Sequence, residues 1–253
     1  MAKIGLAVLE EALRARKLDR TLATALQPFA PSHPNGALTE IAEIDALLQG
    51  GLPRGQLSEI AGSRSSGRTA VLLHVLAAAT RRGEIAALVD PFDCLDVASL
   101  VSAGVDLDRL LWVRGHALAL GRTQGVPLAN RVVERGLKAL NLVLQAGGFG
   151  VVAIDFAEAP LAALNGIPFT TWLRVQRTVE GSETACVFIA PQPLARSAGG
   201  FTLSLGARVR WTGSADCSRR LAGMDVAVRV ISPRRRMNGQ TSHLRTQAPE
   251  HSS

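Results

Sequence analysis

The sequence predicts an α/β fold in which a mostly parallel β-sheet is flanked by helices. Uninterrupted apolar runs at residues 85–89, 151–154 and 185–190 are typical of strands buried on both faces, as in parallel sheets. Helical segments lie between such runs, notably at residues 128–145 and 169–180. Strands that alternate with helices indicate a largely parallel sheet. Further strands are predicted at residues 57–61, 110–113, 208–211 and 227–231, and a further helix at 69–82.

The chain divides into three predicted parts. Residues 1–37 form an N-terminal helical extension and a Pro-rich linker, because residues 4–27 have helical apolar spacing and Pro28, Pro31 and Pro34 follow. Residues 38–232 form the core. Residues 233–253 have no periodicity and few apolar side chains, so we expect a disordered basic tail. The N-terminal helix either docks on another protein or packs on its own core.

Composition favours a cytoplasmic protein with one substantial core. The chain has 253 residues, 47% of them hydrophobic, which is enough to bury such a core. It contains no run of eighteen uncharged apolar residues, and its first residues lack a signal-peptide pattern. The three cysteines are scattered, which suits reduced thiols, and they show no zinc-ligand spacing.

The positive charge is concentrated near the C-terminus. The formal net charge is +7, and the segment from Arg208 to the end holds nine Arg against three acidic residues. Such a patch attracts nucleic acid or an acidic protein surface. The alternative is an ordinary solvated surface in a chain that uses Arg in preference to Lys.

The most informative motif is an octet that resembles a phosphate-binding loop. It consists of Gly62, Ser63, Arg64, Ser65, Ser66, Gly67, Arg68 and Thr69. It matches G-x-x-x-x-G-K-[ST] except that Arg68 replaces Lys, and it lies between a predicted strand and a predicted helix. Glycines let backbone N–H groups surround phosphates, and the helix N-terminus favours anions. We therefore predict that all eight residues bind ATP, with the Thr69 hydroxyl on Mg²⁺.

Arg68 weakens this prediction. Lys is a compact point charge, whereas Arg presents a wide planar fork, so its position against the β- and γ-phosphates would change. Loops rich in Gly and Ser also occur by chance. The placement between strand and helix favours the nucleotide-binding interpretation.

Asp155 is the candidate for the metal side of the same site. It ends the buried apolar run 151–154, where an acidic residue would hold Mg²⁺ through water. The alternative is that Asp155 caps the following turn, as Asp often does. The upstream loop favours the metal-binding interpretation.

Several segments in order resemble RecA recombinases. Residues 50–62 (GGLPRGQLSEIAG) are similar to the approach to the RecA phosphate loop, and residues 88–96 and 103–111 to the next strand, acidic loop and helix. Asp155 falls at the second acidic motif, and residues 188–192 at the nucleotide-sensing strand end. The resemblance covers roughly residues 38–231 and implies a RecA-like phosphate-loop core.

The departures from RecA concern catalysis. The resemblance places Phe92 at the position of the glutamate that activates water, and a phenyl ring cannot accept a proton. Asp93 and Glu158 are conceivable substitutes. Gln192 is either a shifted sensor or, as we favour, a loop residue. The segments that correspond to the two DNA-binding loops of RecA, around 158–167 and 193–200, are shorter. We predict weak or absent ATPase activity.

A shortened RecA-like chain with an altered site is similar to the ImuA family of accessory proteins in mutagenic translesion synthesis. This resemblance implies induction in the DNA-damage (SOS) response. It also implies two partners, an ImuB-type Y-family polymerase-like protein and an error-prone DNA polymerase III α-type subunit, with RecA as a further candidate. DNA contact through the basic C-terminal region stays open. The alternatives are an active RecA-type DNA-dependent ATPase or recombinase and a SulA-like inhibitor of cell division.

Overall fold

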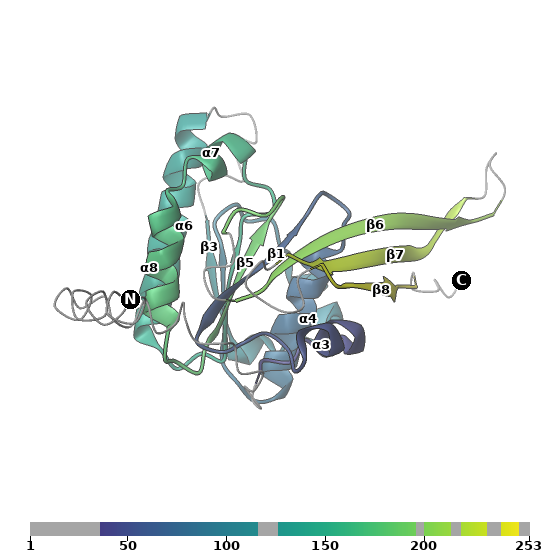
Figure 1. Ribbon diagram of the computed structural model, residues 1–253, viewed down its shortest axis with the longest axis horizontal. Coiled ribbons are helices and arrows are strands. Elements are labelled where there is room, and N and C mark those ends of the chain that lie inside the picture. The colour runs from purple at the N-terminus through teal and green to yellow at the C-terminus, as the bar shows by residue number, and fades with distance from the viewer. Residues whose placement is uncertain (1–35, 116–125, 196–199, 214–218, 232–238, 248–253) are drawn as a thin grey trace, which may run out of the picture. The chain divides into compact units, whose positions relative to one another are not determined.

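The computed structural model describes residues 36–115, 126–195, 200–213, 219–231 and 239–247 (Figure 1). The predicted helix at 4–27, its Pro-rich linker and most of the predicted tail lie outside these ranges. The described helices are α3 (Ala42–Leu48), α4 (Arg68–Arg81), α5 (Val97–Ser102), α6 (Val126–Ala146), α7 (Leu161–Asn165) and α8 (Phe169–Val179). The strands are β1 (Gln56–Gly62), β2 (Ala86–Asp90), β3 (Leu110–Arg114), β4 (Val151–Asp155), β5 (Ala185–Ala190), β6 (Thr202–Thr212), β7 (Arg220–Val230) and β8 (Thr241–Arg245).

All eight strands belong to one sheet in the order β3-β2-β4-β5-β1-β6-β7-β8. The pairs from β3 to β6 are parallel, and β6–β7 and β7–β8 are antiparallel. The predicted α/β class with a mostly parallel sheet is therefore confirmed. Strands β2, β4 and β5 are buried along their whole length, which explains why their sequences are apolar without alternation.

Helices cover both faces of the sheet. One core cluster joins α3, α4 and α5 to side chains such as Ile60, Leu88 and Val187. The other joins α6, α7 and α8 to the alternate residues of the same strands, such as Leu57, Val89 and Phe188. Among the described residues, no helix combines the length and apolar character needed to cross a membrane.

The cluster under α6 and α8 is built around aromatic rings. Phe188 of β5 packs between Phe156, at a centroid distance of 5.8 Å, and Trp172 of α8, at 4.5 Å. All three side chains are almost completely buried. Rings at these separations stabilise the core by about 0.5–1.5 kcal/mol per pair beyond their buried area.

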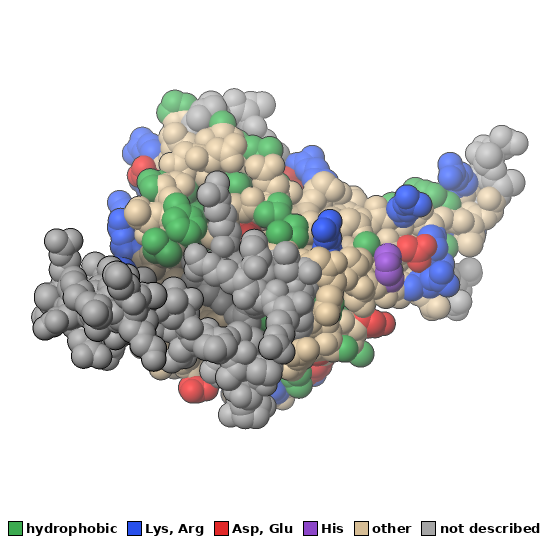
Figure 2. Space-filling model, in the orientation of Figure 1, with side chains coloured by type: hydrophobic (Ala, Val, Ile, Leu, Met, Phe, Trp, Pro, Cys, Tyr) green, Lys and Arg blue, Asp and Glu red, His purple; other side chains and the backbone are tan. Residues whose placement is uncertain are grey.

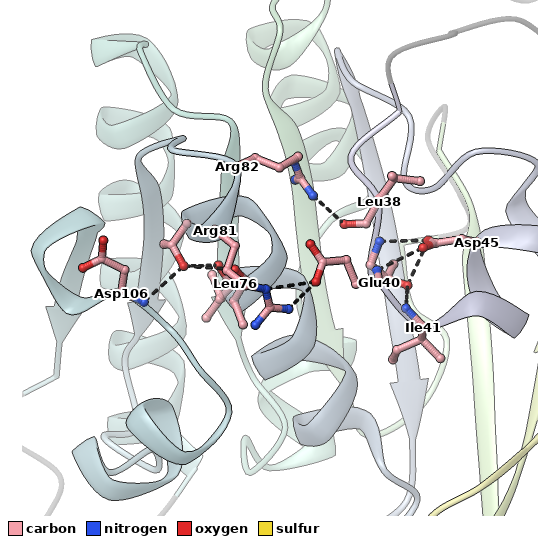
Figure 3. Close-up of polar contacts among 11 residues, drawn as sticks. Leu38, Glu40, Ile41, Asp45, Leu76, Arg81, Arg82 and Asp106 are labelled. Atoms are coloured by element: carbon pink, nitrogen blue, oxygen red, sulfur yellow. Dashed lines mark hydrogen bonds and ion pairs between the residues drawn. The ribbon is translucent and has the colours of Figure 1, made fainter.

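Polar contacts fix the segment before β1 to the C-terminal end of α4 (Figure 3). Arg81 forms an ion pair with Glu40, and Arg82 donates to the Leu38 carbonyl at 3.1 Å. The Asp45 carboxylate accepts a hydrogen bond from the Glu40 N–H at 2.9 Å and closes the turn before α3. Arginines in the last turn also suit the negative end of the helix dipole. The chain therefore enters β1, and then the octet, from a fixed position.

The prediction of a disordered tail from residue 233 was wrong for part of its length. Residues Thr241–Arg245 form β8, which pairs with β7 from Asp225↔Arg245 to Arg229↔Thr241. The side chains of β8 alternate between exposed and half-buried positions, and Leu244 packs against the core. The stability of β8 comes from its hydrogen bonds with β7 and not from a strongly apolar sequence. Its composition therefore resembles that of a disordered tail.

We expect Phe188→Ala to lower the free energy of unfolding by about 3–5 kcal/mol, because it leaves a cavity between two buried rings. Urea denaturation followed by circular dichroism measures the change. The matched control is Phe169→Ala in α8, where the side chain is 45% exposed and a change within about 0.5 kcal/mol is expected. Equal losses in the two variants would contradict this account of the core.

Candidate phosphate-binding site

The octet forms the turn between β1 and α4, as the sequence predicts. Ser65 and Gly67 adopt positive φ angles of 58° and 90°, which curl the backbone before the helix begins. Gly67 is the N-cap of α4, and no side chain caps the helix there. The first N–H groups of a 14-residue helix thus lie at the end of a tight loop, which is the arrangement that binds anions.

The close contact between Gly62 and Ser66 explains the first glycine of the motif. A Cβ at Gly62 would lie 2.3 Å from Ser66 Oγ and 2.8 Å from the Leu205 carbonyl oxygen, so a larger residue cannot fit. Ser66 itself is 1% exposed, and its Oγ has no hydrogen-bond partner among the described residues. An unsatisfied buried hydroxyl beside an uncapped helix N-terminus fits a bound anion. The backbone of the loop therefore remains suited to a phosphate group.

Arg68 is turned into the protein, and its side chain is only 5% exposed. One guanidinium nitrogen donates to the Gly62 carbonyl, and another donates to the Ala157 carbonyl at 2.8 Å and to Glu158 Oε1 at 3.1 Å. The residue that replaces the motif Lys thus ties the start of the loop to the segment after β4. A Lys ammonium cannot span these acceptors in the same way, because it lacks the planar fork.

Glu158 holds the two arginines of the octet together. Its other oxygen, Oε2, accepts from Arg64, with the Nε contact at 3.1 Å. The Glu158 side chain is 29% exposed and that of Arg64 is 77% exposed. The Arg64–Glu158 pair is therefore open to solvent, whereas the Arg68–Glu158 pair is largely covered. One carboxylate thus pairs with both arginines of the loop, which leaves one positive charge unbalanced. A phosphate chain bound by the backbone of this loop, as the sequence predicts, would compete with Glu158 for its arginines.

Asp155 ends β4 and is 3% exposed. Its Oδ1 accepts from the Ala157 N–H at 2.8 Å, which is the turn-capping contact that the sequence left open as an alternative. Burial raises the pKa of Asp155 to about 6, and the nearby Asp90 adds to the shift while Arg68 opposes it. Thr69 is half-buried in the first turn of α4. Their role as Mg²⁺ ligands stays a prediction.

Phe92 belongs to the aromatic cluster rather than to a polar pocket. Its ring meets Phe156 edge-on at 6.2 Å, and Phe156 in turn meets Phe188. Both candidate substitutes for the missing base are ion-paired: Asp93 with Arg114 Nε at 2.7 Å, and Glu158 with the arginines of the octet. Among the described residues, Phe92, Asp93 and Glu158 are thus all engaged in contacts within the chain, beside a loop whose backbone suits an anion.

Glu59 is a site-forming residue that the sequence analysis missed. It lies in β1, is 1% exposed, and accepts from the N–H groups of Leu194 at 2.6 Å and Ala195 at 3.1 Å. Thr202 Oγ1 donates to its second oxygen at 3.2 Å. Burial raises the pKa of Glu59 despite these bonds. Glu59 thus fixes the chain after β5, beyond Gln192. The sequence signal for this residue was an acidic side chain in the middle of a strand that is otherwise largely apolar.

We expect Glu158→Gln to strengthen binding of a fluorescent ATP analogue, because it removes the anion that competes for Arg64 and Arg68. Fluorescence titration of the purified chain with Mg²⁺ present measures the dissociation constant. Glu43→Gln in α3 makes the same charge change at an exposed site and should leave binding unchanged. Affinity that is equal in wild type and Glu158→Gln would contradict the competition.

Comparisons with known proteins find relatives over part of this chain. Residues 34–155 match the family model of the RecA N-terminal domain. The chain is 38% identical to RecA of Cutibacterium acnes over 203 residues, which cover 60% of this chain and 58% of that protein. It is 49% identical to RecA of Nostoc punctiforme over 77 residues, or 30% of this chain and 20% of that one. The match thus spans less than two thirds of these relatives.

A solved structure supports the fold over a longer stretch. The crystal structure of the RadB recombinase aligns with 83% of this chain and 95% of its own, with a TM-score of 0.54 and 17% sequence identity. At this identity the likeness concerns the fold alone. Residues 34–155 are thus similar to the RecA N-terminal domain, and the chain as a whole has a RecA-like fold.

Proposed function

We propose that this chain is a RecA-like accessory protein of SOS-induced, error-prone translesion DNA synthesis that acts through contacts rather than through ATP hydrolysis. One observation carries the proposal: Phe92, at the position of the RecA catalytic glutamate, is packed edge-on against Phe156. General-base catalysis contributes about 10²–10⁴-fold to a rate, and phosphoryl transfer depends on exact positioning. A site without the base is therefore expected to turn ATP over weakly or not at all.

The Arg68 contacts support a scaffold role for the loop. Arg68 joins Gly62 in the loop to Ala157 and Glu158 after β4 through hydrogen bonds within the chain. A loop that is held by internal contacts keeps its shape whether or not a nucleotide is bound. On this proposal ATP and Mg²⁺ are optional ligands, and the core serves to present surfaces to other proteins.

The proposed partners are an ImuB-type Y-family polymerase-like protein and an error-prone DNA polymerase III α-type subunit, with RecA as a further candidate. The contact elements that we propose are the N-terminal helix and the basic run Arg234, Arg235 and Arg236, which lie outside the described residues. Their test must keep β8, because a chain cut before Pro233 would lose the partner strand of β7.

An active RecA-type recombinase is the main alternative, and the 38% identity to RecA of Cutibacterium acnes favours it. It requires DNA-stimulated ATP hydrolysis, which the proposed accessory role does not. A SulA-like inhibitor of cell division is less favoured, because such a protein has no need of the loop glycines. Filamentous growth on overexpression would select it.

We expect the purified chain to release phosphate from ATP at the background rate, with or without single-stranded DNA. The physical reason is that Asp93 and Glu158 are both ion-paired and Phe92 cannot accept a proton. A phosphate-release assay with an active RecA as positive control measures this. Robust DNA-stimulated turnover would select the recombinase alternative and overturn the proposal.

We expect the tagged full chain to capture the purified ImuB-type protein, and a variant with Arg234, Arg235 and Arg236 replaced by Ala to capture less of it. The physical reason is the loss of three positive charges at the proposed contact. Capture that is equal for both would remove the basic run from the proposal. If neither form captures the ImuB-type protein or the polymerase subunit, the accessory role fails.

A further inference from the structure

Strands β6 and β7 form a ribbon that continues beyond the parallel part of the sheet (Figure 1). Strand β6 pairs with β1 only from Thr202 to Leu205, whereas its ladder with β7 continues to Thr212↔Arg220. Strand β8 pairs with the half of β7 nearer the core. We call β6, β7 and β8 together the ribbon. Helix α3 packs against β8, on the face whose side chains belong to the core cluster of α3 and α4.

The register separates the side chains of the ribbon into two unlike faces. Leu205, Val228 and their neighbours on one face belong to the core cluster of α3 and α4. The opposite face carries charged and small side chains, which the ladder pairs as Arg208↔Asp225↔Arg245 and Gly206↔Ala227↔His243. The residues of this arginine face are Ser204, Gly206, Arg208, Arg210, Asp225, Ala227, Arg229, Thr241, His243 and Arg245. We use the name arginine face for this set.

The arginine face has an excess of positive charge that its one acid does not balance. Asp225 is the only acidic side chain among the described residues of the ribbon, and it pairs with Arg210 at 3.2 Å and Arg245 at 3.1 Å. Arg208 and Arg229 are exposed as well. Figure 2 shows the blue side chains spaced along this part of the molecule with little red between them. Four arginines against one aspartate give the face a field that attracts anions.

The spaces between the arginines are open. Gly206 and Ala227 lie side by side on the arginine face, and a Cβ added at Gly206 would meet nothing within 4 Å. Alternate residues of a strand lie about 7 Å apart, and neighbouring strands about 5 Å apart. The guanidinium groups therefore lie on a face with little side-chain bulk at Gly206, which an extended polyanion can approach.

From these observations we infer that the arginine face binds the phosphate backbone of duplex DNA, independently of sequence. This surface is distinct from the segments after β4 and β5, which correspond to the DNA-binding loops of RecA. Guanidinium groups bind phosphates, and such contacts position a protein on DNA without reading bases. The inference deepens the proposed function, because it would hold the accessory protein on the DNA being copied.

Two features favour duplex DNA over other polyanions. An acidic protein partner needs buried apolar anchors, and the exposed apolar side chains of the ribbon, Val209, Trp211 and Leu221, alternate onto the opposite face. Single-stranded DNA needs aromatic rings on which bases stack, and Trp211 lies away from the arginine face with Arg219 over its ring at 5.4 Å. A face of arginines alone suits a backbone whose bases are already paired.

The test is fluorescence anisotropy of the full chain with a labelled 30-base-pair duplex at several salt concentrations. We expect Arg208→Gln with Arg229→Gln to weaken binding about tenfold and to make the slope of log K against log salt shallower by about 2. The corresponding double Lys variant should retain affinity, because it keeps both charges. Arg131→Gln with Arg135→Gln on the exposed side of α6 removes the same charge elsewhere and should change affinity less than twofold.

The outcomes separate this inference from its rivals. Circular dichroism and thermal melting confirm first that each variant is folded. The inference is overturned if the double Gln variant binds the duplex as tightly as the wild type does. It is also overturned if the chain binds single-stranded DNA more tightly than duplex DNA and Trp211→Ala abolishes that binding. Preference for a poly-glutamate peptide over DNA would assign the face to an acidic protein instead. None of these results depends on partner capture or ATP turnover, so the inference and the proposed function can fail separately.

Discussion

The contact between Arg68 and Glu158 determines how the rest of the site is arranged. A guanidinium that is 95% covered is unfavourable unless its donors are satisfied, and here the acceptors are two backbone carbonyls and a carboxylate. These acceptors come from the two ends of the site, Gly62 and the segment after β4. Arg68 therefore depends on Glu158 for one of its partners, and together they join the loop to the segment after β4. Removing Glu158 alone would leave a buried charge with fewer partners, so the two residues act as a unit.

The aromatic cluster also holds residues of the site in contacts within the chain. Phe92 packs on Phe156, and Phe156 is fully buried against Phe188. A carboxylate at residue 92 would lie beside apolar rings, where loss of hydration disfavours its charged form. One substitution back to Glu is therefore not enough to restore a base, because its surroundings have changed with it. The internal ion pair and the aromatic cluster both stabilise the site through contacts within the chain, which supports the proposal that hydrolysis is weak or absent.

Sequence reasoning succeeded where the structural cause was local. Buried parallel strands need continuous apolar runs, so β5 was predicted at its observed bounds and β4 within one residue. Sequence reasoning failed for residues whose hydrogen-bond partners are distant in the chain. Glu59 is held by residues about 135 positions away, and Arg68 by Glu158, 90 positions away, so neither contact leaves a local pattern. Strand β8 was missed because a short edge strand takes its stability from the ladder with β7.

The ribbon connects these results to an accessory role. The proposed accessory role requires that the protein hold components together, which raises their effective concentration. Such a scaffold needs surfaces that do not obstruct one another. The alternation of an antiparallel ladder meets this requirement, because it places the arginines on one face and Val209, Trp211 and Leu221 on the other. On the proposed function, a partner on the apolar side would leave the arginine face free for DNA, so the ribbon would hold two components at once without a change in conformation.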